Sequence, residues 1–139
     1  MARADKFTYT GKQLELYSDF LIDFSINPVT GLLARVTNEE AIKQSIKNLV
    51  LTTFTERPYH PLLGSQIKTS LMEPLDPTSQ EIIRSTIETS LKQEPRARII
   101  GINVTPLYDD YAMSIEVQFT SINIPNRSFS VNLTLDILR

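Results

Sequence analysis

Apolar residues recur at the spacing of one helix face between residues 37 and 54, and again between residues 76 and 94. The first stripe consists of Ile42, Ile46, Leu49, Val50 and Phe54. The second consists of Ile83, Ile87 and Leu91, with Ile82 at its margin. Residues three, four and seven positions apart lie on one side of an α-helix, so both segments are predicted to be helices that bury their stripes.

The first helix carries a start signal and a clear stop. Thr37 and Glu40 have the spacing of a capping box, in which both side chains accept hydrogen bonds from backbone N–H groups at a helix start. The segment "ERPYHPLLG" then ends the helix with two prolines and a glycine. A short helical turn is expected afterwards, around Ile67, Leu71 and Met72.

The second helix has two possible starts. Asp76 followed by Pro77 gives a capping residue and a proline at the first helical position. Thr78 and Glu81 offer a competing capping box two residues later. Pro95 disfavours helical geometry in the residue before it, so the helix is predicted to end there.

The last third of the chain changes to the alternating period of β-strands. Three segments alternate, around Ile100 to Val104, Tyr111 to Phe119 and Phe129 to Ile137. The connections "PLYDD" and "NIPNR" are short, which favours an antiparallel meander with its apolar face on the helices. The predicted fold class is α+β.

The N-terminal part of the chain shows neither the helical nor the alternating period over any long stretch. Residues 1–17 mix polar and aromatic types without a period, which predicts an arm that is ordered only where a neighbour covers it. Two short apolar runs then flank Asn27-Pro28 and Thr30-Gly31, which indicates a hairpin. Because 139 residues suit one ordinary domain, residues 18–139 are expected to form it.

Composition narrows the class of function. Fourteen basic and sixteen acidic residues give a net charge of −2, without the basic stripe that nucleic-acid binding usually shows. No apolar run approaches the roughly 20 residues of a membrane helix, and no signal peptide is apparent. We therefore expect neither nucleic acid nor a membrane as a partner. The absence of cysteine excludes disulfides and thiolate metal sites.

Candidate catalytic groups are few. A two-carboxylate hydrolase could draw on Glu94, Asp109 and Asp110, but the two aspartates lie where a hairpin turn would recruit them anyway. His60, the only histidine, stands in a proline-broken loop without a second metal ligand at a suitable spacing. No catalytic group, metal site or cofactor is predicted.

Two features suggest contacts with a partner. The outward positions of the last strand, including Ser130, Asn132 and Thr134, lack the charges that usually protect a sheet edge. They could belong to a merely solvated face, or to an edge that accepts a strand from a partner.

The second feature is Glu94-Pro95-Arg96, at the predicted corner between helix and strand. Its charges could be used locally, with Arg96 on helix carbonyls and Glu94 paired to a nearby base. Alternatively, the arginine fork could project to form bidentate hydrogen bonds with a partner. In that case Arg96→Ala should leave the isolated domain folded without a large fall in melting temperature.

The order of these segments resembles a known family. The sequence "NPVTG", the capped helix "NEEAIKQSIKNLVLT", "ERPYHPLLG", a proline-started helix ending in "EPR", and "VTPLYDDYAMSIEVQF" are together similar to the GPW family of baseplate wedge proteins. The resemblance covers roughly residues 20 to 120. The family is related to the TssE component of type VI secretion.

The resemblance implies a structural, non-enzymatic subunit of a contractile-tail baseplate with a core like that of the tail sheath protein. In the family, the corner that corresponds to Glu94, Pro95 and Arg96 contacts the helical core bundle of the wedge, and strands are offered to the first sheath ring. The implied location is the virion tail baseplate, after assembly in the host cytoplasm. A lysozyme-like wall hydrolase and a type VI secretion baseplate component are the alternatives.

Overall fold

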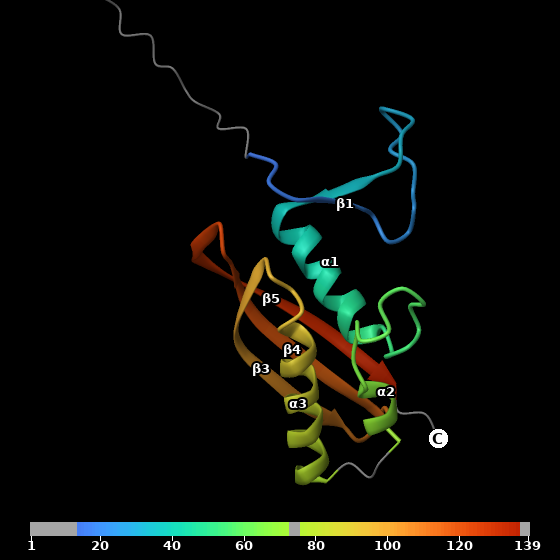
Figure 1. Cartoon of the computed structure of the whole chain (residues 1–139), viewed down its shortest axis with the longest axis vertical. Helices are drawn as coiled ribbons and strands as arrows, with labels where there is room; N and C mark the ends of the chain where they lie inside the picture. Colours follow the sequence, from blue (N-terminus) through green and yellow to red (C-terminus); the bar gives the residue numbers. More distant parts are fainter. Residues whose placement is uncertain (1–13, 73–75, 137–139) are drawn as a thin grey trace, which may run out of the picture.

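The computed structural model describes residues 14–72 and 76–136 of the chain (Figure 1). Eight elements follow one another: β1 (Ser18–Phe20), β2 (Arg35–Thr37), α1 (Asn38–Leu51), α2 (Ile67–Ser70), α3 (Pro77–Leu91), β3 (Ala97–Leu107), β4 (Ala112–Ser121) and β5 (Ile124–Asp136). Strands β1 and β2 form a small hairpin, whereas β3, β4 and β5 form an antiparallel meander in that order.

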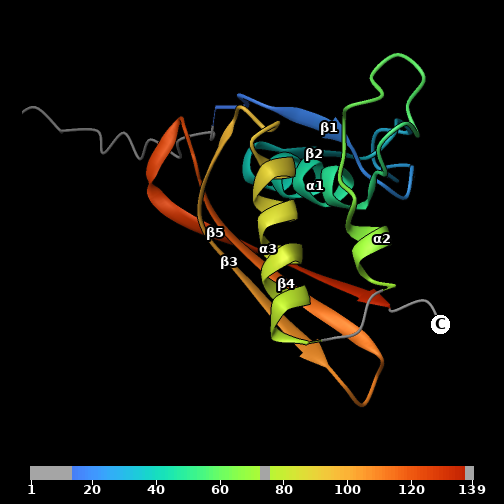
Figure 2. The same ribbon diagram turned by 60° about the horizontal axis from the view of Figure 1, so that its bottom comes forward.

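The two long helices pack on one face of the three-stranded sheet, with α3 along β3 and α1 toward β5 (Figure 2). Every second residue of β4 points into this layer, and Met113, Ile115, Val117 and Phe119 are completely buried. The helix stripes meet them, since Ile42, Ile46, Ile83 and Ile87 are also fully buried. The α+β prediction is confirmed, including the hairpin and the short helix α2.

Helix α1 starts where the capping box predicts, but the capping box does not form. Thr37 is extended and its side chain makes no capping hydrogen bond, while Glu40 instead forms an ion pair with Lys43 at 2.6 Å. Asn38, the first residue of α1, has a positive φ of 50°, a conformation that asparagine tolerates better than most residues. Its buried side chain accepts the N–H of Leu16 at 2.9 Å and donates to the carbonyl of Leu14 at 3.1 Å.

The other end of α1 also differs from the expectation. The helix stops at Leu51, so Phe54 lies beyond it and is only half-buried. Thr53 leaves the helix to form a parallel bridge with Ser65. Gly64 makes this close return possible, because a Cβ atom there would overlap the carbonyl oxygen of Thr52.

Helix α3 uses the first of its two possible starts. The carboxylate of Asp76 accepts the N–H of Ser79 at 2.7 Å, and Pro77 occupies the first helical position. The buried stripe is confirmed, and Ile82 at its margin is 46% exposed. The helix ends at Leu91, three residues before Glu94. The N–H groups of Gln93 and Glu94 donate to carbonyls three residues back, in a tighter turn than that of an α-helix.

The sheet corrects three details of the predicted strands. A bulge between Ile99 and Gly101 turns Ile99 toward the core and leaves Ile100 57% exposed, which reverses the expected orientation. Tyr111 lies in the turn before β4, with a φ of 49°. The expected connection "NIPNR" is mostly strand, since β5 already begins at Ile124; the predicted last residue, Ile137, lies outside the described residues.

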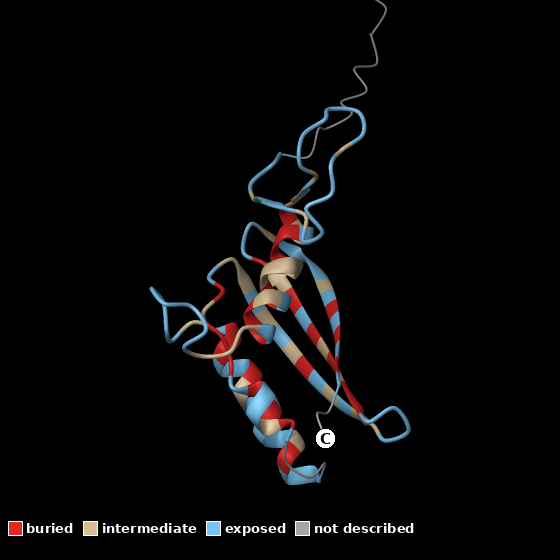
Figure 3. Cartoon of the chain, turned by 90° about the vertical axis from the view of Figure 1, so that its right-hand side faces the viewer, coloured by how far each residue is buried: buried red, intermediate tan, exposed pale blue. Residues whose placement is uncertain are grey.

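The β1–β2 hairpin projects beyond the start of α1 (Figure 1), and Figure 3 shows that most of the segment is exposed. Its turn forms at the predicted place, with the N–H of Gly31 donating to the carbonyl of Asn27. Of the predicted arm, residues 14–17 are described, and Tyr17 packs against the core cluster. No helix in the described part of the chain is long and apolar enough to cross a membrane.

Candidate functional site

The sequence Glu94-Pro95-Arg96, here called the corner, joins the end of α3 to the start of β3. Its position follows from two local causes. Pro95 cannot continue a helix, and the alternating pattern of β3 begins immediately after Arg96. Pro95 is exposed, Arg96 is half-buried, and Glu94 is 4% exposed. A buried carboxylate beside an exposed proline is the unusual property of this corner.

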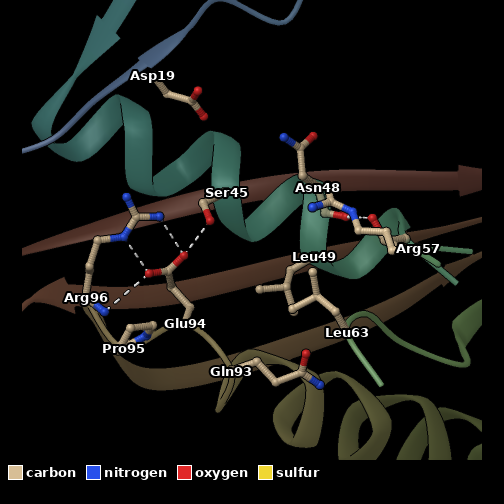
Figure 4. A pocket seen from close by; sticks show the side chains of 11 residues that line it. Asp19, Ser45, Asn48, Leu49, Arg57, Leu63, Gln93, Glu94, Pro95 and Arg96 are labelled. Atoms are coloured by element: carbon tan, nitrogen blue, oxygen red, sulfur yellow. Dashed lines mark hydrogen bonds and ion pairs between the residues drawn. The ribbon is translucent and has the colours of Figure 1, made fainter. Parts of the chain in front are cut away.

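The buried carboxylate of Glu94 accepts four hydrogen bonds from other groups of the chain (Figure 4). The guanidinium of Arg96 donates to it through Nε at 2.6 Å and through Nη2 at 2.8 Å. The backbone N–H of Arg96 donates at 3.2 Å, and the hydroxyl of Ser45 donates from α1. The corner is thereby tied to the neighbouring helix as well as to itself.

The arginine is also held from the N-terminal side. Its guanidinium carbon lies 5.4 Å from the centre of the Tyr17 ring, a cation–π contact. The hydroxyl of Tyr17 accepts a hydrogen bond from Asn123, in the turn between β4 and β5. Arg96 therefore connects the corner with the segment before β1 and, through Tyr17, with the end of the sheet.

These contacts shift the pKa values of both Glu94 and Arg96. Burial raises the pKa of Glu94, but the hydrogen bonds from Arg96 and Ser45 and the charge of Arg96 outweigh it, so the pKa lies below its usual value. The hydrogen bonds with Glu94 raise the pKa of Arg96 against the opposing effect of burial. Both groups are charged at neutral pH.

A groove of about 440 Å³ runs from the corner along α1. Asp19 of β1, Asn48 and Leu49 of α1, and Arg57 and Leu63 of the following loop share its lining with the corner. Figure 4 shows the acidic, amide and guanidinium side chains around this groove. It is therefore a mixed polar and apolar surface and carries charges of both signs.

The geometry corrects the expectation that the arginine fork projects to a partner. Two of its three nitrogens are occupied by Glu94, so a second bidentate contact through the same edge is not available. The local interpretation is correct in pairing Glu94 with a base, and this base is Arg96 itself. Sequence reasoning missed Ser45 and Tyr17, because contacts over 49 residues and more leave no local signal.

The other predicted contact residues lie elsewhere. Ser130, Asn132 and Thr134 are exposed on the outer face of β5, opposite the side that carries Val131 and Leu133 into the core. Strand β5 pairs with β4 on one side, and no other strand of the described residues pairs with its second side. Its free edge and the corner are separate features of the surface.

The candidate catalytic residues do not come together. Asp109 and Asp110 lie in the turn after β3, whereas Glu94 lies before its start, so they are separated by the length of an eleven-residue strand, roughly 35 Å. His60 is exposed in the loop after α1. No three metal-binding side chains within the described ranges are placed to hold a metal ion.

The family comparison decides the identity. Residues 36–125 match the model of the family described as baseplate wedge protein gp25. The chain belongs to this family. The match spans both long helices, the corner, β3 and β4, so it includes Glu94, Pro95, Arg96 and Ser45, whereas Tyr17 and Asp19 precede it. The chain is accordingly a baseplate wedge protein of contractile tails.

Individual relatives agree with the assignment. The baseplate wedge protein gp25 of Enterobacteria phage T4 is 29% identical over 104 residues, which cover 74% of this chain and 79% of that protein. A Geobacter sulfurreducens structure, provisionally described as a tail lysozyme, has a TM-score of 0.69 at 20% identity and covers 75% of this chain and 95% of that one.

A second structural neighbour comes from an assembled baseplate. A chain of the anti-feeding prophage baseplate has a TM-score of 0.60 at 18% identity, over 88% of this chain and 87% of that one. At such identities these two structures establish a common fold.

Proposed function

We propose that this wedge protein is a non-enzymatic scaffold with two contacts. The corner docks on the helical core bundle formed by other wedge subunits, and the free edge of β5 accepts strands from the first ring of tail sheath protein. The protein then acts in the virion tail baseplate, after assembly in the host cytoplasm. The observation that carries this proposal is the corner, a rigid and partly exposed structure within the family match.

Rigidity of the corner favours docking. The Glu94 carboxylate holds the guanidinium of Arg96 in one orientation, and Tyr17 supports it from the other side. A side chain that is already fixed loses less conformational entropy when a partner binds. The pair with Glu94 leaves Nη1 of Arg96 unbonded among residues 14–72 and 76–136, so the predicted contact is a hydrogen bond from Nη1 to a partner carbonyl or carboxylate.

The edge of β5 supports the second contact. The strand runs for thirteen residues, and from Ser128 to Leu135 it contains neither a charge nor a proline. Natural edge strands usually carry such residues to prevent pairing with another chain. An unprotected edge of this length offers backbone N–H and C=O groups that an added strand can use.

The hydrolase alternative needs a carboxylic acid that is protonated near neutral pH. Glu94 has the opposite property, because its hydrogen bonds lower its pKa. Asp109 and Asp110 lie at the opposite end of β3 from Glu94. Their distance from Glu94 is well outside the roughly 5–10 Å that separates a glycosidase pair. These facts favour a scaffold over an enzyme. The family match and the phage T4 relative favour a phage tail over a type VI secretion device.

Substitution of Pro95 tests the docking contact while both members of the Glu94–Arg96 pair remain in the chain. Pro95→Glu should prevent co-elution with the wedge subunits encoded beside this chain, since it places a carboxylate on the exposed face of the corner. Pro77→Glu is the matched control, because Pro77 is exposed at the opposite end of α3 and helix starts accept acidic residues. Equal co-elution of both variants would remove the corner from the interface.

A further inference from the structure

The hairpin before α1 exposes more apolar surface than its size explains. Half of the large apolar side chains that are exposed in the described residues lie between positions 14 and 33. We call six of them the hairpin surface: Phe20, Ile22, Phe24, Ile26, Leu32 and Leu33, which are 40–70% exposed. Exposed large apolar side chains that are concentrated in one short segment are typical of interaction sites in soluble proteins.

Residues 14–72 and 76–136 provide little cover for this surface. The hairpin consists of three residue pairs between β1 and β2 and a further bridge from Ile26 to Leu33. Its base is attached to α1, where Gln44 donates to the carbonyl of Phe20 at 2.6 Å and to the carboxylate of Asp19 at 3.2 Å. A two-stranded ribbon without a covering layer is marginally stable in water, so a partner that covers it would gain an apolar contact and stabilise it.

The charges around the surface indicate what the partner is. Glu15, Asp19 and Asp23 are exposed on the same segment and outnumber its only base in the described range, Arg35, so the segment is acidic. The complementary surface is therefore apolar and bordered by lysine or arginine. A second copy of this chain fits poorly, because a two-fold contact would bring the same carboxylates together.

The position of the hairpin links it to the corner. Asp19 lines the same groove as Glu94, Pro95 and Arg96, so one partner that covers the corner can reach the base of the hairpin. The family match begins at residue 36, directly after this segment. The hairpin surface is thus a feature of this chain that the family match does not include.

We propose that the hairpin surface docks in an apolar depression with a basic border on the wedge subunits that the corner engages. This inference rests on the proposed function for the identity of those subunits. It adds an apolar contact, whereas the corner supplies a polar one. The two contacts depend on different residues, so each can be removed while the other stays intact.

The test uses the full chain and the purified wedge subunits encoded beside it. Phe24→Ser with Ile26→Ser changes the outer half of the hairpin, away from the contacts of Gln44. We expect binding to weaken by about tenfold or more, as for apolar residues at the centre of an interface. Met72→Ser with Tyr108→Ser is the matched control, because these residues are 66% and 62% exposed and do not line the groove at the corner. This control should bind like the native chain.

The outcomes separate this inference from the proposed function. If the hairpin variant binds normally while Pro95→Glu does not, the hairpin inference is overturned and docking by the corner stands. If the hairpin variant is weakened and Pro95→Glu is not, the hairpin inference holds and the corner proposal fails. Native dimers that the hairpin variant abolishes, with unchanged binding to the wedge subunits, would assign the surface to a second copy and overturn the inference.

Discussion

Removal of the Arg96 side chain should destabilise the isolated protein, because it leaves the carboxylate of Glu94 buried without its counterion. Glu94 is 4% exposed and would keep the Ser45 hydroxyl and one backbone N–H as donors. Loss of one member of a fully buried pair costs about 3–5 kcal/mol. Because the Arg96 side chain is 32% exposed and water can reach the site, we expect about 2–3 kcal/mol for Arg96→Ala.

The assay is thermal unfolding of the native chain and the variant. For a chain of 139 residues, each kcal/mol corresponds to about 3–4 °C, so the melting temperature should fall by about 6–12 °C. Arg98→Ala is the control, because Arg98 is exposed on β3 and forms no ion pair in the described part of the chain. Glu94→Gln combined with Arg96→Ala should recover part of the loss, since no charge is then buried.

The pH dependence gives an independent check. In the native chain the folded pKa of Glu94 is lowered, so its contribution is present above the unfolded pKa of about 4.3 and is lost as the pH falls through the folded pKa. In Arg96→Ala, burial without the counterion should raise the folded pKa, so protonation relieves the variant at acidic pH. The difference in stability should therefore be smaller at pH 4 than at pH 7. A loss below about 1 kcal/mol, or one that does not change with pH, would refute the reasoning.

Further expectations concern the sheet edge and three structural positions. Asn132→Lys should block sheath growth on an otherwise complete baseplate, whereas Gln118→Lys, on the same face of the central strand β4, should not; normal growth with both variants would remove β5 as the acceptor of sheath strands. Gly64→Ala should cost about 2 kcal/mol or more in chemical denaturation, because φ is +121° and Thr52 blocks the Cβ position, whereas Gly31→Ala, with open space, should cost about 1 kcal/mol. Asn38→Ala should raise the hydrogen-exchange rate of the Leu16 amide, which loses its acceptor, while the amides in the middle of α3 should exchange as before; an unchanged rate at Leu16 would mean that Asn38 does not hold this segment.

Local physics explains what the sequence could predict about the fold. The buried stripes of α1 and α3 follow from spacing, and the cap of α3 follows from Asp76 and Pro77, because these signals depend on neighbours within one or two turns. The alternation of β4 and the turn at Gly31 are local in the same sense. The bulge at Ile100 and the early end of α1 escaped prediction, since both arise from pairing with distant strands and loops.

The same distinction between local signals and tertiary contacts applies to the candidate functional site. From the sequence alone, the corner is recognisable as a rigid junction with opposite charges, because Pro95 restricts the backbone on both sides. Only the tertiary structure decided that Arg96 turns back onto Glu94, that Ser45 and Tyr17 complete the arrangement, and that Asp109 and Asp110 lie at the far end of β3. The orientation of a charged side chain depends on which acceptors the folded chain brings within about 3 Å, and in this protein those acceptors and supports come from α1, the segment before β1 and the corner itself.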